Sequence, residues 1–383
     1  MSLVMLGIGT AVPEHRIAQS DAAGLAISFA NAAPGRERAL AAVYRQSGIR
    51  TRGSVLLEPA EDDEPFVQRF FPPAEAGGDR PSTGARMRRY AEEAGRLALQ
   101  AASAALASSG LDVDEITHLV SCSCTGFANP GVDLELVRTL GLPAAVARTH
   151  VGFMGCHGAF NALRVADAFV TANPAAVALV SCVELCSLHL QYGSHGDHVV
   201  ANSLFADGAA AVIGVGRGHA AAANGGWRII AQASEVLPDS DREMGWLIGD
   251  SGFEMTLSPR VPGLIAGQLR PAVEEMLARA GIAAGDVATW AVHPGGPRIL
   301  GGVEEALGLP TDTLAVSRGV LADHGNMSSA TILFILERLA RAGAAGPCVA
   351  LAFGPGLTVE LAVLDRVAGP GAEAARSAPR APK

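Results

Sequence analysis

The stretch GFMGCHGAFNALRVA, residues 152–166, places a cysteine between two glycines and continues with apolar residues at helical spacing. Gly155 and Gly158 permit a tight turn from a strand into a helix, so Cys156 is expected near a helix N-terminus. The helix dipole and the unpaired backbone N–H groups at such an end favour a thiolate over a thiol. The stretch therefore predicts an α/β fold with a nucleophilic cysteine at a strand-to-helix turn; a small, buried structural cysteine is the alternative.

Strand-like and helix-like runs alternate on both sides of this stretch. Short runs rich in Val, Ile and Leu, typical of strands covered on both faces, occupy 117–122, 175–184, 208–216, 287–294, 347–354 and 358–365. Ala- and Leu-rich runs with helical spacing occupy 88–109, 157–172, 268–280 and 327–342. This alternation predicts an α/β fold built in layers.

Two landmarks recur at nearly the same interval. Gly110 and Gly281, which are 171 residues apart, each end a helical run and precede an acidic residue and a strand. Gly155 and Gly325, which are 170 residues apart, each come before a polar or thiol side chain and an apolar helix. The repeat indicates two halves of similar build.

The repeat also suggests the domain boundaries. We expect residues 1–217 to form the half that carries the cysteine and residues 226–366 to form the second half. The Gly- and Ala-rich stretch 216–226 has the composition of a connecting loop. Residues 368–383 contain few apolar side chains and are expected to be disordered.

The composition excludes several classes of protein. Of 383 residues, 49% are hydrophobic and 17% are charged, which is too apolar for a mainly disordered chain. The net charge of -9 offers no basic field for a polyanion, so no nucleic-acid partner is expected. We find neither an apolar run of about 18 residues nor the pattern of a signal peptide, and we expect no membrane segment and a cytoplasmic location.

The cysteines do not predict a disulfide scaffold or a metal site. They stand at positions 122, 124, 156, 182, 186 and 348. Six are too few to staple a chain of this size, and a reducing compartment would keep them as thiols. No histidine pair at ligand spacing accompanies them, so no metal is expected.

Two further polar residues stand where predicted strands and turns end. His293 in AVHPGGPRIL (291–300) is followed by Pro294 and two glycines, which would end a strand and leave the imidazole at its edge. Asn326 in DHGNMSSATILFIL (323–336) occupies the place in the second half that Cys156 occupies in the first. A satisfied histidine and a helix-capping asparagine are the alternatives. In a duplicated fold with a pseudo-twofold axis, however, the equivalent helix starts face each other, and the three side chains could converge.

Seven segments, in order and at the right separations, resemble the chalcone synthase family, the type III polyketide synthases. They are VSCSCTGFANPGVD, GFMGCHGAFNALRVA, SLFADGAAAVIGVG, VPGLI, HPGGPRIL, GNMSSATILFIL and AFGPGLTVE, and the resemblance spans about residues 3–366. It implies a thiolase-like αβαβα layered fold made of two pseudo-symmetric halves. It also implies a homodimer and a catalytic triad of Cys156, His293 and Asn326.

The residue types account for the implied reaction. A Cys156 thiolate beside the His293 imidazolium attacks an acyl-CoA and holds the starter as a thioester. The His293 ring N–H and the Asn326 amide then stabilise the enolate that forms when malonyl-CoA loses CO2. The enolate attacks the bound acyl group and extends it by one two-carbon unit. Acyl-CoA and malonyl-CoA are therefore the expected partners, and no cofactor beyond these thioesters is expected.

The resemblance further implies a cavity and its lining. Phe205 in SLFADG matches the family's aromatic gatekeeper, with ordinary core packing as the alternative. The cavity would be lined by Cys124, Thr125, Asn129, Cys186, His189, Trp246, Met255, Ser328 and Gly354. Asn129 stands where a family methionine reaches into the partner subunit's cavity. Arg45, Arg50 and Arg52 are candidates for holding the CoA phosphates, with a solvated arginine face as the alternative.

Several cavity positions depart from plant chalcone synthases. Cys124, Cys186 and His189 replace small hydroxyl residues, and Trp246 and Met255 replace a glycine and a phenylalanine. The segments VELCSLH (183–189) and MGWLIGDSGF (244–253) are more similar to bacterial members that resemble alkylpyrone and alkylresorcinol synthases. The two cavity cysteines are also similar to those of tetrahydroxynaphthalene synthase.

These departures favour a fatty acyl starter and a pyrone or resorcinol-type product over a flavonoid. Met255 and the compact cysteines could line a narrow acyl channel, whereas Trp246 could equally block one. The sequence leaves the starter, the number of extensions and the mode of cyclisation open.

Three other functions share part of the pattern. A β-ketoacyl-ACP synthase III shares the fold and triad, but GNMSSA, HPGGP and SLFADG are more similar to type III polyketide synthases. A papain-like hydrolase has the same order of Cys, His and Asn, but its nucleophile lies near the mature N-terminus, whereas 155 residues precede Cys156. A non-catalytic scaffold of the same fold has no physical need for all three polar residues.

Overall fold

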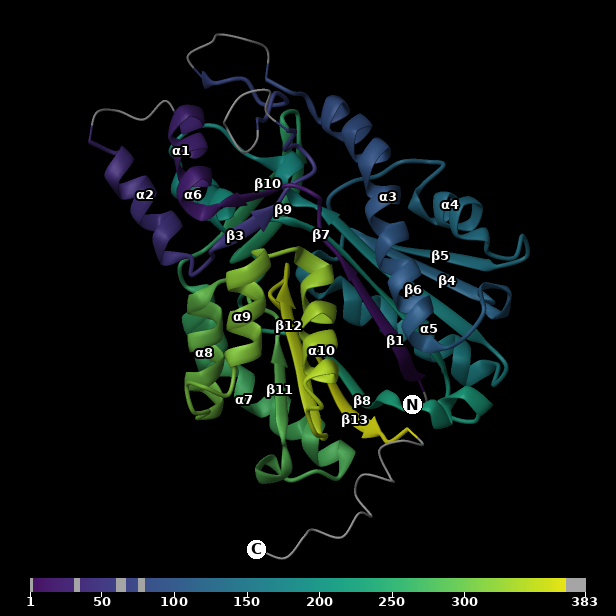
Figure 1. Ribbon diagram of the computed structural model, residues 1–383. Helices are drawn as coiled ribbons and strands as arrows, with labels where there is room; N and C mark the ends of the chain where they lie inside the picture. Colours follow the sequence, from purple (N-terminus) through teal and green to yellow (C-terminus); the bar gives the residue numbers. More distant parts are fainter. Residues whose placement is uncertain (1–2, 31–34, 60–66, 75–79, 370–383) are drawn as a thin grey trace, which may run out of the picture.

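The computed structural model describes residues 3–30, 35–59, 67–74 and 80–369 (Figure 1). Most of the predicted tail, from residue 370 onward, lies outside these residues. The strands of the described chain are β1 (Leu3–Ala11), β2 (Arg16–Ala18), β3 (Thr51–Gly53), β4 (His118–Ser123), β5 (Ala147–Gly152), β6 (Val177–Leu185), β7 (Asp207–Gly216), β8 (Gly226–Val236), β9 (Met244–Gly249), β10 (Gly252–Leu257), β11 (Thr289–Val292), β12 (Cys348–Gly354) and β13 (Thr358–Val367). The α-helices are α1 (Gln19–Ala30), α2 (Glu37–Gln46), α3 (Thr83–Ser109), α4 (Val132–Leu136), α5 (Gly158–Ala172), α6 (Gly196–Leu204), α7 (Val261–Ala280), α8 (Pro297–Leu307), α9 (Ala315–His324) and α10 (Thr331–Arg341).

The long strands form one sheet of order β11-β12-β13-β8-β1-β7-β6-β4-β5. β1 pairs with β7 along its length but with β8 only at Val4 and Met5, so this short contact joins the strands of the two halves. Every residue of β6 and β7 is buried. This burial explains the continuous apolar runs in the sequence, because both faces of these strands are covered.

Helices cover the sheet in layers. α5 and α10 contribute Leu163 and Leu333 to a central core with residues of β6 and β12. α3 covers the outer face of the first half, and α7 and α8 cover the outer face of the second half. Figure 1 shows the first half, purple to teal, above and to the right of the second half, green to yellow. The predicted αβαβα layering is confirmed.

The sequence repeat corresponds to a repeated structure. α3 and α7 both end at a glycine in the left-handed conformation, Gly110 with φ 72° and Gly281 with φ 69°. Each glycine is followed by a 3-10 turn and then by the strand β4 or β11. The equivalent helices α5 and α10 each follow a further 3-10 turn. The turn before α5, Gly155–His157, contains Cys156, and the turn before α10, Ser328–Ala330, begins two residues after Asn326.

Some elements are not predicted from the sequence. α1, α2 and the hairpin β9–β10 are among them, and residues of each line the cavity described below. Among the described residues, no helix is both long and apolar enough to cross a membrane.

Close contact between β1 and α3 gives a first testable prediction. A Cβ atom at Gly9 would lie 2.2 Å from the carbonyl oxygen of Ala101, whereas one at exposed Gly267 in α7 would meet open space. Gly9→Ala should therefore force α3 away from the sheet and lower the free energy of unfolding by about 1–3 kcal/mol. Gly267→Ala should raise it by roughly 0.5–1 kcal/mol, because alanine is the better helix former.

Urea denaturation of the two variants and the parent protein measures both effects. A Gly9→Ala variant as stable as the parent would contradict the packing described here.

Candidate active site

Cys156 lies in a 3-10 turn, Gly155–His157, between β5 and α5. Gly155 has φ 78°, and a Cβ there would lie 2.7 Å from Cδ of Pro355. A Cβ at Gly158 would lie 2.8 Å from the sulfur of Cys122. Both glycines are therefore required, because the turn is packed between two other segments.

Asn326 comes to this turn from the second half. Its backbone N–H donates to Leu204 O, and its carbonyl accepts from Ala206 N–H, each at 2.9 Å. Its side-chain Oδ1 accepts a hydrogen bond from Ser328 N–H at 2.9 Å, which leaves the Nδ2 donors free for other groups. The side chains of Asn326 and Ser328 both hydrogen-bond Cys156.

His293 follows directly after β11. Its backbone N–H donates to Leu351 O of the neighbouring strand at 2.9 Å, and the residue is 1% exposed. Neither ring nitrogen has a hydrogen-bond partner among the described residues. The ring interacts electrostatically with His157, the residue after Cys156. This is not the satisfied histidine that the sequence left open, since both nitrogens are available.

Burial dominates the protonation of the thiol and the imidazole. It raises the pKa of Cys156 to about 11, although hydrogen bonds from Ser328 and Asn326 act in the opposite direction. It lowers the pKa of His293 to about 3. The sequence predicted that the helix N-terminus would favour a Cys156 thiolate. For the thiolate alone, the cost of burying its charge outweighs this effect. Transfer of the Cys156 thiol proton to the His293 imidazole would create two opposite charges. Their attraction would offset part of the cost of burying each charge.

A buried carboxylate, Glu184, lies beside the thiol and was not singled out from the sequence. It accepts hydrogen bonds from Thr125 Oγ1 at 2.7 Å, from the Cys124 N–H at 3.0 Å, and from Ser329 Oγ. Burial raises its pKa, and its charge raises the pKa of Cys156. Because Ser329 belongs to the second half, Glu184 connects the two halves at the site. The sequence did contain a signal for this residue, because Glu184 is an acidic residue within an otherwise apolar strand.

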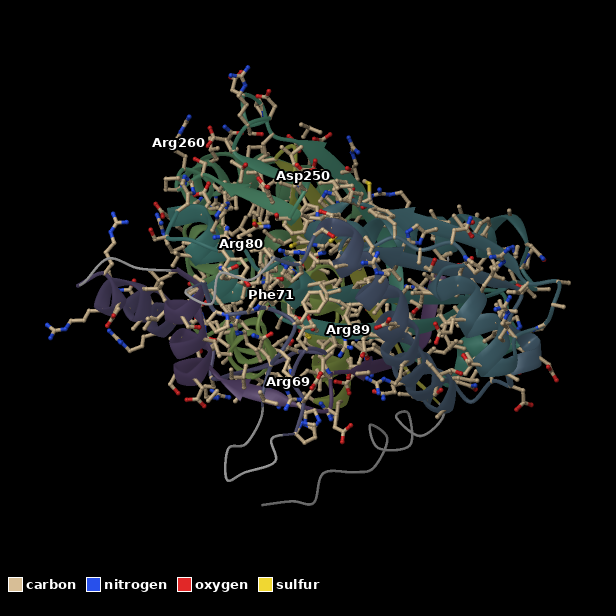
Figure 2. All side chains as sticks on the ribbon, turned by 90° about the horizontal axis from the view of Figure 1, so that it is seen from above. Arg69, Phe71, Arg80, Arg89, Asp250 and Arg260 are labelled. Atoms are coloured by element: carbon tan, nitrogen blue, oxygen red, sulfur yellow. The ribbon has the colours of Figure 1, made fainter. Side chains whose placement is uncertain are left out.

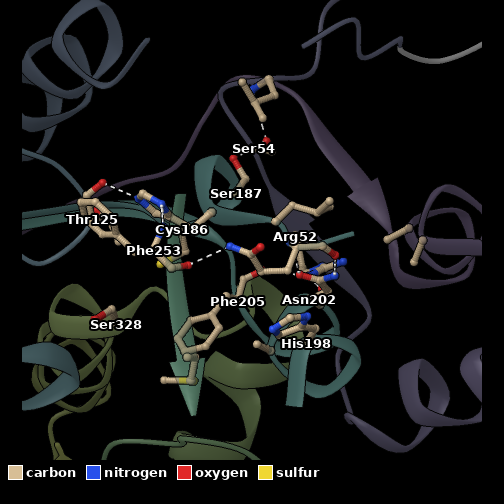
Figure 3. Close-up of a pocket in the computed structure, with 18 of the residues that line it drawn as sticks. Arg52, Ser54, Thr125, Cys186, Ser187, His198, Asn202, Phe205, Phe253 and Ser328 are labelled. Carbon is tan, nitrogen blue, oxygen red and sulfur yellow. Dashed lines mark hydrogen bonds between the residues drawn. The ribbon is translucent and has the colours of Figure 1, made fainter. Parts of the chain in front are cut away.

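A cavity extends from Cys156, and Figure 3 shows part of its lining. Most of the predicted residues line it: Cys124, Thr125, Cys186, His189, Phe205, Trp246, Met255 and Ser328. Two do not. Asn129 is exposed at the surface, and Gly354 is buried where a Cβ would lie 2.2 Å from the ring of His157. Gly354 therefore leaves room for the ring of His157, and it does not line the cavity.

The three candidate phosphate-binding arginines have different environments. Arg45 is exposed on α2, and Arg50 forms an ion pair with Asp323. Arg52 lines the cavity, and its NH1 donates to the carbonyl oxygens of Asn202 at 2.6 Å and Phe205 at 2.8 Å. This internal bonding does not support the role in CoA binding predicted for Arg52. The residue instead holds the segment that carries Phe205.

The free imidazole gives a second prediction. A His293→Gln variant lacks the imidazole proposed to accept the thiol proton, so burial should keep the pKa of Cys156 well above its ordinary value. Alkylation of Cys156 by iodoacetamide should be slower than in the parent protein at pH 7.5 and should still rise with pH at pH 10, because the thiolate is the reactive form.

Peptide mass mapping across pH 6–10 would measure this rate at Cys156 separately from the other five cysteines. If the alkylation rate of the His293→Gln variant reaches a plateau below pH 8, the His293 imidazole does not control the ionisation of the Cys156 thiol.

Comparison with known proteins gives a consistent result. Residues 2–218 match the family described as chalcone and stilbene synthases, N-terminal domain, and residues 228–368 match its C-terminal domain. The chain is 36% identical over 369 residues to an "Alpha-pyrone synthesis polyketide synthase-like Pks18" of Mycobacterium tuberculosis, covering 94% of this chain and 91% of that protein. It is 35% identical over 362 residues to the 1,3,6,8-tetrahydroxynaphthalene synthase of Streptomyces peucetius subsp. caesius, covering 93% and 91%.

Solved structures agree with these relatives. The crystal structure of PKS-I from the brown alga Ectocarpus siliculosus superposes with a TM-score of 0.87 at 30% identity, covering 95% of this chain and 98% of that one. The type III polyketide synthase domain of Steely1 from Dictyostelium superposes with a TM-score of 0.84 at 28% identity, covering 96% and 100%. The chain belongs to the chalcone and stilbene synthase family and is a type III polyketide synthase.

Proposed function

We propose that this polyketide synthase carries its starter acyl group on Cys156 and extends it with malonyl-CoA. The observation that supports this most directly is the environment of the thiol: the Asn326 amide hydrogen-bonds it, and the buried His293 ring has no competing partner among the described residues. These three side chains come from segments far apart in the sequence. Their roles as nucleophile, base and oxyanion donor follow from their chemistry.

Loading requires a proton acceptor for the Cys156 thiol. His293 can take this proton because neither of its nitrogens is hydrogen-bonded within the described residues. The thiolate then attacks the carbonyl carbon of the acyl-CoA, a new C–S bond forms, and the C–S bond to CoA breaks. The proton on His293 passes to the CoA thiolate, which leaves as the free thiol.

Extension requires stabilisation of an enolate. Ser328 N–H holds Oδ1 of Asn326, so the amide presents its Nδ2–H donors to the sulfur and to a substrate carbonyl beside it. With His293, this donor would bind the thioester oxygen of malonyl-CoA as its carboxylate leaves as CO2. The enolate carbon then attacks the acyl thioester, and the Cys156 thiolate is released. Because the site is buried, each neutral donor acts more strongly than in water.

We further propose a fatty acyl-CoA starter and a pyrone or resorcinol-type product. The cavity lining is mainly apolar, and a relative with 36% identity over most of the chain is named for α-pyrone synthesis. The similarity to tetrahydroxynaphthalene synthase keeps an aromatic product within the proposal. We propose that CoA thioesters suffice without another cofactor and that the enzyme acts in the cytoplasm.

A homodimer is also part of the proposal. Phe127 and Met154 are large apolar residues that are 41% and 39% exposed, and Asn129 is exposed two residues after Phe127. Exposed apolar side chains around a projecting residue are typical of a surface that another subunit covers. Asn129 would then approach the cavity of the partner subunit, as the family resemblance implies.

One assay tests the proposed reaction as a whole. The purified protein is incubated with labelled malonyl-CoA and acyl-CoAs from C2 to C18, and products are identified by mass. We expect condensation products from free malonyl-CoA without an acyl carrier protein. Turnover that strictly requires the carrier protein would instead favour a β-ketoacyl-ACP synthase III-like enzyme, and no turnover under either condition would contradict the proposal.

Asn326 gives a more specific prediction. Asn326→Ala removes the Nδ2 donors, and the loss of one oxyanion donor should slow malonyl-CoA decarboxylation by about 3 kcal/mol, or roughly 150-fold. Asn326→Asp should lose at least as much, because a carboxylate oxygen would face the developing negative charge. CO2 release from labelled malonyl-CoA measures this step.

Circular dichroism serves as the control that both variants remain folded. Decarboxylation at the parental rate by the folded Asn326→Ala protein would refute the role given to this amide.

A further inference from the structure

A chain of polar side chains begins at His157, the residue after Cys156, and leads away from the cavity. His157 stands at the start of α5, and Asn161 and Arg164 follow it at intervals of four and three residues, so the three share one face of the helix. This face is turned towards β13, where Glu360 is 1% exposed. The reaction described above uses none of these four residues.

An ion pair forms the far end of this chain. Arg164 pairs with the carboxylate of Glu360, and Arg164 NH1 lies 3.4 Å from Oε1 of that carboxylate. Asn161 Nδ2 donates to the same Oε1 at 3.0 Å, and Asn161 Oδ1 lies 2.9 Å from Nδ1 of His157. Hydrogen bonds therefore connect the ion pair to the ring beside the nucleophile.

The direction of these hydrogen bonds determines the tautomer of His157. A carboxylate paired with a guanidinium only accepts hydrogen bonds, so Asn161 turns its Nδ2 donors to Glu360 and its Oδ1 acceptor to His157. Nδ1 of His157 must therefore carry the proton. In the neutral ring, Nε2 then has a lone pair and no proton.

The Nε2 edge of the ring lies at the carboxyl end of β12. A Cβ at Gly354, the last residue of β12, would lie 2.2 Å from Cδ2 and 2.8 Å from Nε2 of His157. The backbone of His293 is bonded to the same strand through Leu351 O, and the two histidine rings interact electrostatically. The rings of His157 and His293 are therefore neighbours at this end of the strand.

The charge on His157 decides what it does to His293. A positive charge on His157 lowers the pKa of His293, because it repels an imidazolium there. Burial lowers the pKa of His157 itself, and the charges of Glu360 on β13 and Arg164 on α5 act on it in opposite directions. His157 is therefore neutral near pH 7, when Cys156 beside it has to lose its proton. A neutral ring that offers a lone pair favours a nearby cation.

We propose that His157 is a positioning residue for this proton transfer: the Glu360–Asn161 chain holds it as the Nδ1–H tautomer, and its Nε2 lone pair stabilises the imidazolium of His293. The proton leaves the sulfur of Cys156 and binds to a ring nitrogen of His293, and His157 itself gains and loses none. This inference rests on the proton transfer in the proposed function and adds the groups that support it.

The pH profile of Cys156 alkylation tests this role without requiring turnover. His157→Asn keeps an amide donor near Asn161 but has no atom at the position of Nε2. It should shift the profile to higher pH and lower the alkylation rate at pH 7 by roughly tenfold, the effect of losing one hydrogen-bond acceptor to a charged group. Iodoacetamide treatment across pH 6–10, followed by peptide mass mapping, measures the profile.

Glu360→Gln tests the chain from its far end. A glutamine can donate as well as accept, so Asn161 can reverse its amide, and the proton of His157 then moves from Nδ1 to Nε2. The profile should shift in the same direction, with a rate at pH 7 lower by about three- to tenfold. In the double variant with His157→Asn the shift should equal that of His157→Asn alone, because Glu360 acts through His157.

Glu243→Gln is the matched control. Glu243 is also a buried carboxylate, 8% exposed, and it pairs with the more exposed Arg260 at 2.9 Å. Figure 2 shows Arg260 at the outer surface of the molecule. This change should leave the profile of Cys156 unchanged. If Glu360→Gln does not fold, Asn161→Leu is used; it has a similar shape, keeps the ion pair and should shift the profile in the same direction.

Two results would overturn the inference: a parental profile in the folded His157→Asn protein, or a double variant in which the two shifts add fully. Condensation products formed by the parent protein under either result would leave the proposed function intact. The expected shifts, in a protein that forms no condensation products from acyl-CoA and malonyl-CoA, would support the role of His157 and refute the proposed function.

Discussion

Two backbone hydrogen bonds hold Asn326 of the second half against the Leu204–Ala206 segment of the first, and the arrangement of the site depends on them. They fix the position of the Asn326 amide relative to the Cys156 thiol and to Phe205. Arg52 binds the same segment from the other side, and a Cβ at Gly325 would lie 3.2 Å from its Cγ atom. A displacement of these two hydrogen bonds would therefore move Asn326 and Phe205 together.

The burial of Cys156 and His293 determines which charges can form in the site. Burial penalises a charge on Cys156 or His293 alone, so charge develops there only when an opposite charge or a hydrogen-bond donor accompanies it. Asn326 suits this environment because it donates without carrying a charge. Glu184 is kept at the site by hydrogen bonds from Ser123, Cys124 and Thr125 of the first half and from Ser329 of the second half. The carboxylate thus serves to position the loops around the thiol.

Features with a local cause could be predicted from the sequence. The apolar runs predicted the covered strands, Gly110 and Gly281 marked two helix ends, and the glycines around Cys156 predicted its turn. Features that depend on distant partners could not be predicted in this way. The hydrogen bonds from Arg52 to the carbonyl oxygens of Asn202 and Phe205 are one example, and the role in CoA binding predicted for Arg52 stays a prediction.

The central claim is that Cys156, His293 and Asn326 act on one acyl group. The most direct measurement is a crystal structure of the protein after reaction with a medium-chain acyl-CoA. The account predicts continuous density from the Cys156 sulfur into the cavity, with the thioester oxygen facing the His293 ring and Nδ2 of Asn326. An acyl group on another residue, or a thioester oxygen turned away from both donors, would contradict it.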